Sequence, residues 1–168
     1  MLEKVVTRTV PAPVPVKPAL VRAGKLNLPV IGLEEWATIE VDQPNATGLQ
    51  LRARIDTGAE GTWLSVLSVS EQEQDGQLYV RFELPAGEEK NEGQHSLEAP
   101  VQRSVNIKRQ GENGRRYVIR LWLKIGGSRA LVDVNLVARD GGKAPLQVGR
   151  NFLTDEAIVD VGQRYIAN

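Results

Sequence analysis

The sequence predicts an all-β domain with a single core, and three observations support this. From Val30 onward, short runs rich in β-formers are separated by Gly, Asn and Asp. Several of these runs alternate apolar and polar residues, as half-buried strands do. The chain has 168 residues, of which 41% are hydrophobic and 25% charged, a composition typical of one ordinary globular domain with some extra length.

The extra length lies at the N-terminus. Residues 1–28 are predicted to form an extended linker or arm, and residues 29–168 the folded domain. Alternation of Pro with Ala and Val characterises the arm, at Pro11, Pro13, Pro15 and Pro18. Such a segment suits a stalk that joins a removed signal or anchor to an exported, periplasmic domain. A cytoplasmic tail is the alternative.

The run Leu49–Ile55 is the clearest half-buried strand, because Leu and Ala alternate with Gln and Arg up to Ile55. A turn signal at Asp75-Gly76 precedes the strand expected over 78–84, and Gly126-Gly127 predicts a hairpin connection. The further expected elements are strands over 78–84, 130–137, 145–148 and 158–161, a hairpin over 101–125 and one short helix over 151–157. No internal repeat is found, so a two-fold site would need two copies of the chain.

Composition narrows the chemistry. Twenty-one basic residues balance twenty-one acidic ones, so no global field favours nucleic acid or an anionic membrane. The chain has no Cys and one His, which argues against thiol chemistry and against a zinc site. No apolar stretch reaches the roughly 20 residues of a membrane span. We therefore expect no metal and no cofactor.

A carboxylate motif follows the strand at 49–55. In Asp56-Thr57-Gly58-Ala59, the Asp presents a carboxylate at the strand end, the Thr hydroxyl can brace the loop, and the Gly permits a sharp turn. These properties suit a catalytic acid. An ordinary Asp-Thr-Gly turn is the structural alternative.

Two segments resemble the retropepsins. Residues 56–64, Asp-Thr-Gly-Ala-Glu-Gly-Thr-Trp-Leu, are similar to the active-site segment of that family. Residues 146–154, Leu-Gln-Val-Gly-Arg-Asn-Phe-Leu-Thr, are similar to the Gly-Arg-Asn segment that packs beside it. The resemblance implies a closed acid-protease barrel with one short C-terminal helix. It implies a catalytic Asp56, an active-site loop of Thr57, Gly58 and Ala59, and structural support from Glu60, Thr62, Gly149, Arg150 and Asn151.

The segment Glu98-Ala99-Pro100 and the residues after the hairpin turn further resemble a bacterial branch commonly labelled ATP-dependent zinc protease. The residues do not support that label, because the chain has neither a zinc constellation nor a phosphate loop ending in Lys-Ser or Lys-Thr. Two departures also stand out. Gln147 replaces a usually apolar residue, and Glu60-Gly61 replaces the Lys or Arg followed by Thr that is typical of this branch.

The resemblance implies an aspartic-type peptidase, a class that needs two carboxylates about 3 Å apart sharing a proton. With one candidate Asp, the chain would act as a homodimer on a peptide or protein substrate. The hairpin of residues 102–120 would cover the cleft as a flap. Arg150 is predicted to pair with Glu60 and so to fix the loop that carries Asp56.

A second hypothesis is a catalytically silent module of the same fold that binds an acidic or isopeptide-linked peptide. Basic side chains near the hairpin tip could dock such a peptide, although charge at a turn is usually only solvated. They are Lys108, Arg109, Arg115 and Arg116. The single His95 is expected to be a solvated loop residue.

Overall fold

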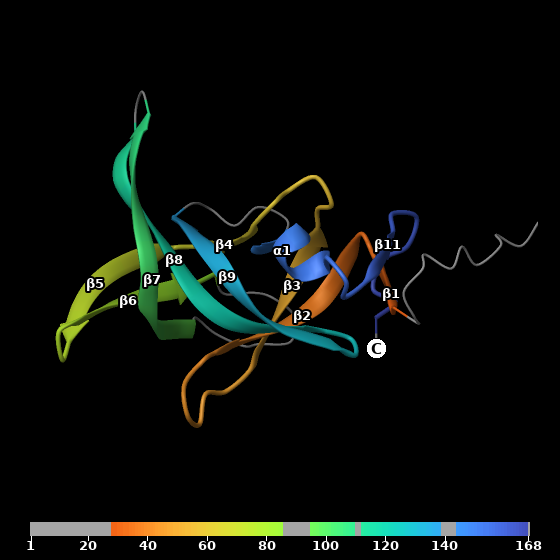
Figure 1. Cartoon of the computed structure of the whole chain (residues 1–168), viewed down its shortest axis with the longest axis horizontal. Helices are drawn as coiled ribbons and strands as arrows, with labels where there is room; N and C mark the ends of the chain where they lie inside the picture. The colour runs from red at the N-terminus through yellow and green to blue at the C-terminus, as the bar shows by residue number, and fades with distance from the viewer. Residues whose placement is uncertain (1–27, 86–94, 110–111, 139–143, 168) are drawn as a thin grey trace, which may run out of the picture.

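The computed structural model describes residues 28–85, 95–109, 112–138 and 144–167, and the Pro-rich arm predicted over 1–28 lies almost entirely outside them. Within these ranges the chain is mostly β-strand, with one short helix (Figure 1). The first six strands are β1 Val30–Gly32, β2 Glu34–Val41, β3 Leu49–Ile55, β4 Thr62–Val66, β5 Ser68–Gln74 and β6 Gln77–Leu84. The remaining elements are β7 His95–Arg109, β8 Glu112–Ile125, β9 Ser128–Ala138, β10 Leu146–Val148, α1 Arg150–Leu153 and β11 Ile158–Asp160.

Six strands close a barrel, in the order β2-β3-β10-β4-β9-β8, and the pairing of β2 with β8 completes the ring. Strand alternation explains why the barrel forms. The side chains of β2 alternate between half-buried and buried, and those of β3 follow the same period. The inward side chains are aliphatic, including Leu51, Leu64, Leu121 and Leu146, each at most 2% exposed. The predicted closed barrel is therefore confirmed.

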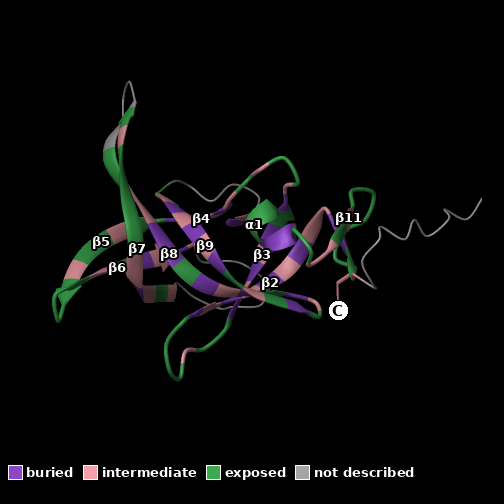
Figure 2. Ribbon diagram, in the orientation of Figure 1, coloured by how far each residue is buried: buried purple, intermediate pink, exposed green. Residues whose placement is uncertain are grey.

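Three further strands extend the sheet beyond the barrel. Strands β7, β6 and β5 continue from β8, with β5 at the edge. Figure 1 shows the β7–β8 hairpin rising from the body and the β5–β6 pair projecting to the side. Most exposed residues of the sheet lie on these strands, chiefly β5 and β7, whereas buried residues follow the barrel and also include Val80, Phe82 and Leu84 of β6 (Figure 2).

A separate two-stranded parallel ribbon joins the two ends of the domain through β1 and β11. The fully buried carboxylate of Glu35 ties this region together. Its Oε1 accepts hydrogen bonds from the amides of Gly32 at 2.7 Å, Ile166 at 3.0 Å and Ala167 at 3.2 Å. Three donors offset much of the cost of burying a charged group.

Several sequence-based boundaries need correction. The helix covers Arg150–Leu153 rather than 151–157, because Thr154 is already extended and Asp155 has a positive φ of 63°. The hairpin starts earlier than predicted, since β7 already includes Glu98-Ala99-Pro100. His95 is the first residue of β7, half-buried and paired in register with Leu84, so its prediction as a solvated loop residue was wrong. The edge strand β5, mostly polar, was not predicted.

Candidate active site

Asp56 stands directly after β3, where the sequence placed it. Its backbone amide donates to the carbonyl of Val148 in β10 at 2.9 Å, which anchors the start of the loop to the barrel. Its carboxylate Oδ1 accepts hydrogen bonds from the amides of Gly58 at 2.9 Å and Ala59 at 3.2 Å. The Asp-Thr-Gly-Ala turn therefore folds around its own carboxylate and fixes that oxygen.

Gln147 holds the other oxygen of Asp56, with Nε2 donating to Oδ2 at 2.9 Å. The placement follows from strand alternation in β10. Leu146 and Val148 point into the core at 0% exposure, so the residue between them must face outward, toward the loop. The sequence marked Gln147 only as a departure from an apolar position. Its place between two buried residues beside the loop was the available signal for this contact.

Hydrogen bonds of Thr62 with Gly149 and Asn151 fix the end of the loop against the start of the helix. The hydroxyl of Thr62, a fully buried residue, donates to Asn151 Oδ1 at 2.7 Å and accepts the amide of Gly149 at 3.2 Å. Gly149 must lack a side chain, because a Cβ there would lie 2.2 Å from the carbonyl oxygen of Gly61. The Gly149-Arg150-Asn151 segment thus packs against the active-site loop, as the resemblance implied.

Arg150 reaches the loop in a different way from the one predicted. Its Nη1 donates to the main-chain carbonyls of Thr57 at 3.2 Å and Gly58 at 2.8 Å, and its backbone amide donates to the carbonyl of Ala59 at 2.8 Å. No ion pair joins Arg150 to Glu60, although both are described. The predicted pair was wrong because the loop turns its carbonyls toward the guanidinium, while the Glu60 side chain is exposed. Glu60 takes part through its backbone carbonyl, which accepts the amide of Asn151 at 3.0 Å.

The loop faces an open surface. Asp56 is half-buried, whereas Thr57 and Gly58 at the tip are exposed. Beside it lies a hollow of about 580 Å³, within the size range of ligand pockets. Its walls come from the loop, β4, β7, β9 and α1, through Ala59, Glu60, Gly61, Trp63, Arg103, Asp133, Asn135 and Asn151. Loop and hairpin together therefore frame a hollow that an extended chain could enter.

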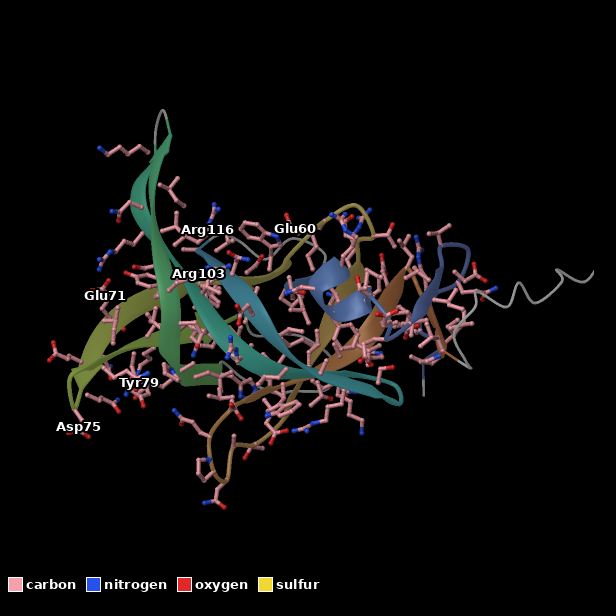
Figure 3. The ribbon with its side chains drawn as sticks, in the orientation of Figure 1. Glu60, Glu71, Asp75, Tyr79, Arg103 and Arg116 are labelled. Carbon is pink, nitrogen blue, oxygen red and sulfur yellow. The ribbon has the colours of Figure 1, made fainter. Side chains whose placement is uncertain are left out.

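The four basic residues near the hairpin tip do not act as one group. Arg115 turns to the outer face, where Nη1 contacts Glu71 Oε1 of β5 at 2.9 Å. Arg116 turns to the site face, where its guanidinium lies 4.7 Å from the Trp63 ring centre. In Figure 3, Arg116, Arg103 and Glu60 are labelled above Asp75, which lies at the turn between β5 and β6. Lys108 is exposed, and the side chain of Arg109 lies outside the described atoms.

Neither a metal site nor a membrane helix is found in the described ranges. No group of three His, Asp or Glu side chains lies close enough there to hold a metal ion. No helix of these ranges is long and apolar enough to cross a membrane.

The closed barrel, the Asp-Thr-Gly-Ala loop and the Gly-Arg-Asn segment packed against it define a retropepsin-like protein. A family model described as the retropepsin-like aspartic endopeptidase RimB matches residues 30–168. The chain belongs to this RimB-like family.

Other proteins and a solved structure contain a similar domain. The chain is 28% identical over 138 residues to probable alpha-L-glutamate ligases of Shewanella pealeana and Shewanella halifaxensis, covering 81% of this chain and 29% of each relative. It thus spans under a third of the length of these relatives. A crystal structure of a Legionella pneumophila protein of unknown function is similar with a TM-score of 0.66 and 30% identity, covering 83% of this chain and 98% of that one.

Proposed function

We propose that this protein is an aspartic peptidase in which Asp56 from two copies of the chain forms the catalytic dyad. One observation carries the proposal. The Asp56 carboxylate is held by three hydrogen bonds at the end of a barrel strand, yet it remains half-exposed at an open face. A rigid, accessible carboxylate is what general acid–base chemistry requires.

The chemistry would use two such carboxylates sharing one proton. The ionised one accepts a proton from a water molecule, whose oxygen attacks the scissile carbonyl carbon, while the protonated one gives its proton to the carbonyl oxygen. The tetrahedral intermediate then collapses as the C–N bond breaks and the nitrogen takes up a proton. The β7–β8 hairpin would exclude water and grip an extended peptide, as a flap does.

Dimerisation is supported by the surface beside the loop. Val30 of β1 and Ile158 of β11 are register partners and are 44% and 40% exposed, with Val161 68% exposed just beyond them. The ribbon connects to the active-site strand, because the amide of Ile55 donates to the carbonyl of Leu33 at 2.8 Å. An apolar edge next to a half-complete site suits a symmetric contact between two copies.

The substrate class we propose is glutamate-rich peptide. The relatives that contain a similar domain are named probable alpha-L-glutamate ligases, so this domain occurs in chains whose name implies the formation of glutamyl bonds. A peptidase acting on glutamyl chains would oppose that reaction. Arginines on the hairpin, including Arg103 and Arg116, supply positive charge beside the site.

A silent binding module is the second candidate, and one contact favours it. Gln147 Nε2 donates to Oδ2 of Asp56, and an oxygen engaged in this way is less available to a catalytic water or to a second carboxylate. In that case the protein would hold an acidic peptide without cutting it.

Cleavage profiling separates the two. A panel of glutamate-rich and neutral peptides is incubated with the protein from acid to neutral pH, and products are identified by mass spectrometry. We expect cleavage by the wild type and a loss of about 10⁴-fold or more in Asp56→Asn, since the substitution replaces both carboxylates of the symmetric dyad with amides. Asp75→Asn, at an exposed hairpin turn, is the matched control and should keep full activity. Binding without cleavage would favour the silent module.

A further inference from the structure

We infer that Arg116, held against Trp63 beside Gln147, forms a subsite for the carboxylate of a substrate residue next to the scissile bond. The inference rests on the proposed function, because it identifies the side chain that would bind a carboxylate of a glutamyl chain. It also singles out one arginine among several on the same hairpin.

The first observation is the orientation of Arg116. Its guanidinium lies 4.7 Å from the centre of the Trp63 ring, a cation–π contact that restrains the side chain without using its N–H donors. Trp63 is itself fixed, since its backbone in β4 pairs with Gln147 of β10 and with Asn135 of β9. The donors of Arg116 are therefore preorganised for a planar acceptor.

The second observation is the lack of a carboxylate partner for Arg116 within the described residues. Neighbouring arginines are paired. Arg115 contacts Glu71 at 2.9 Å, while Arg120 and Arg103 share Asp133 at 2.9 and 3.8 Å. Among the described side chains, Arg116 touches an aromatic ring instead. A half-buried cation without a counter-ion favours an anionic ligand.

The third observation is the position of the subsite. Trp63, Arg116, Val137 and Gln147 line one hollow of about 250 Å³. This is below the usual volume of a small-molecule pocket and suits a single side chain. Gln147 also bonds to Asp56 at 2.9 Å, so the hollow adjoins the catalytic carboxylate. A substrate residue placed there would be next to the bond that is cut.

These features select a carboxylate rather than an apolar group. The hollow has one aromatic and one aliphatic wall, which suit the methylene stem of Glu, and a guanidinium that can bind both carboxylate oxygens. Two sources could supply the carboxylate, the side chain of Glu or the α-carboxylate at the end of a peptide. The experiment must tell them apart.

The test measures both binding and cleavage. In the Asp56→Asn background, calorimetry gives the Kd of a glutamate-rich peptide, of variants with single Glu→Gln changes, and of the C-terminally amidated form. The same peptides are assayed for cleavage with the active protein. Arg116→Gln is compared with Arg115→Gln, which removes the same charge from the adjacent, outward-facing residue.

We expect Arg116→Gln to weaken binding by about 10- to 100-fold and to bring Glu and Gln peptides to equal affinity at one position. Arg115→Gln should retain the wild-type preference. If the wild type cuts no peptide, the peptidase proposal fails while the Kd values still test the subsite. If only amidation of the C-terminus weakens binding, and Glu→Gln changes do not, the ligand of Arg116 is the α-carboxylate. Equal losses in the two variants would overturn the inference. So would a protein with Arg116 intact that prefers neither Glu over Gln nor the free C-terminus over the amidated one.

Discussion

Two carboxylates in this protein are held by similar donors and yet have different roles. Glu35, in the region that joins the chain ends, accepts hydrogen bonds from three backbone amides and is 0% exposed. Asp56, in the active-site loop, accepts bonds from two backbone amides and one side-chain amide and is half-exposed. The number of donors is the same, whereas the access differs, and one of the donors to Asp56 is a side chain.

Access, more than the number of hydrogen bonds, separates the two carboxylates. Glu35 has none of its surface in water, so it links segments of the chain. Asp56 has a fixed orientation and an open side, which is what the proposed chemistry needs. The donor from Gln147 is also the one contact at Asp56 that a side-chain substitution can remove.

The largest expected effect is on stability at Glu35. Glu35→Leu removes the acceptor for three buried or half-buried amides and should lower the free energy of unfolding by about 3 kcal/mol or more, since each stranded donor costs about 1 to 3 kcal/mol. Urea unfolding measures this. Glu34→Leu is the matched control, because that carboxylate is partly exposed and accepts a hydrogen bond from the Tyr165 hydroxyl at 3.2 Å, not from buried backbone amides. Similar losses in the two variants would contradict the assigned role.

Next is the contact beneath the active-site loop. Gly149→Ala would place a Cβ 2.2 Å from the Gly61 carbonyl oxygen, so the backbone must move, at a cost of about 1 to 3 kcal/mol. The displaced loop should also lower kcat/KM. Gly127→Ala is the control, since no atom lies within 4 Å of a Cβ built there. Equal thermal stability of both variants would show that the loop does not depend on this close packing.

The third prediction concerns the donor to Asp56. Gln147→Leu restores the apolar residue usual in retropepsins and removes the hydrogen bond that orients Oδ2 of Asp56. We expect kcat/KM to fall by up to about tenfold, because one hydrogen bond is worth about 1 kcal/mol. The melting temperature should change little. An unchanged kcat/KM would show that Gln147 does not act through Asp56.

A smaller effect is expected at Arg150. Arg150→Lys keeps the charge and loses the planar group that donates to the carbonyls of Thr57 and Gly58. Because the side chain is exposed, the loss should be about 1 kcal/mol, measured by thermal unfolding. Glu60→Gln should cost less, and the double variant should be additive, since the two side chains do not pair. A non-additive effect in the double variant would show that the Arg150 and Glu60 side chains do interact.

The smallest effect concerns a third carboxylate, the exposed Glu71 of the edge strand β5. Partial burial and the hydrogen bond to Glu71 raise the pKa of Tyr117 to about 12. The hydrogen bond from Tyr117, followed by the bond from Arg115, lowers the pKa of Glu71.

These two pKa shifts determine how the stability of the protein changes with pH. The contribution of Tyr117 is fully present below its ordinary pKa of 10 and is lost as pH rises toward about 12, while that of Glu71 is lost as pH falls below its ordinary 4.5. Tyr117→Phe should therefore flatten the decline in melting temperature between pH 10 and 12. An equally steep decline in the variant would rule out this source.

Much of the barrel and the identity of the candidate catalytic acid followed from the sequence. Period-2 alternation in residues 49–55 predicted β3, and the Asp-Thr-Gly-Ala word at its end located Asp56, because both features are local. The mostly polar strand β5 lacked such a signal, since it forms by pairing with β6 rather than by burying a face. Helix length was set by the turn at Asp155, which propensity alone did not reveal.

The sequence by itself determined which residues could do chemistry: one motif Asp, no Cys and a single His. Only the tertiary structure decided which of them meet. Gln147 and Asp56 are 91 residues apart, and Arg116 reaches Trp63 only because β4 and β8 flank β9. Arg115 and Arg116 are adjacent and chemically identical, yet strand alternation sends one to Glu71 and the other to the active-site face. Such contacts depend on sheet register and long-range pairing, which local sequence does not encode.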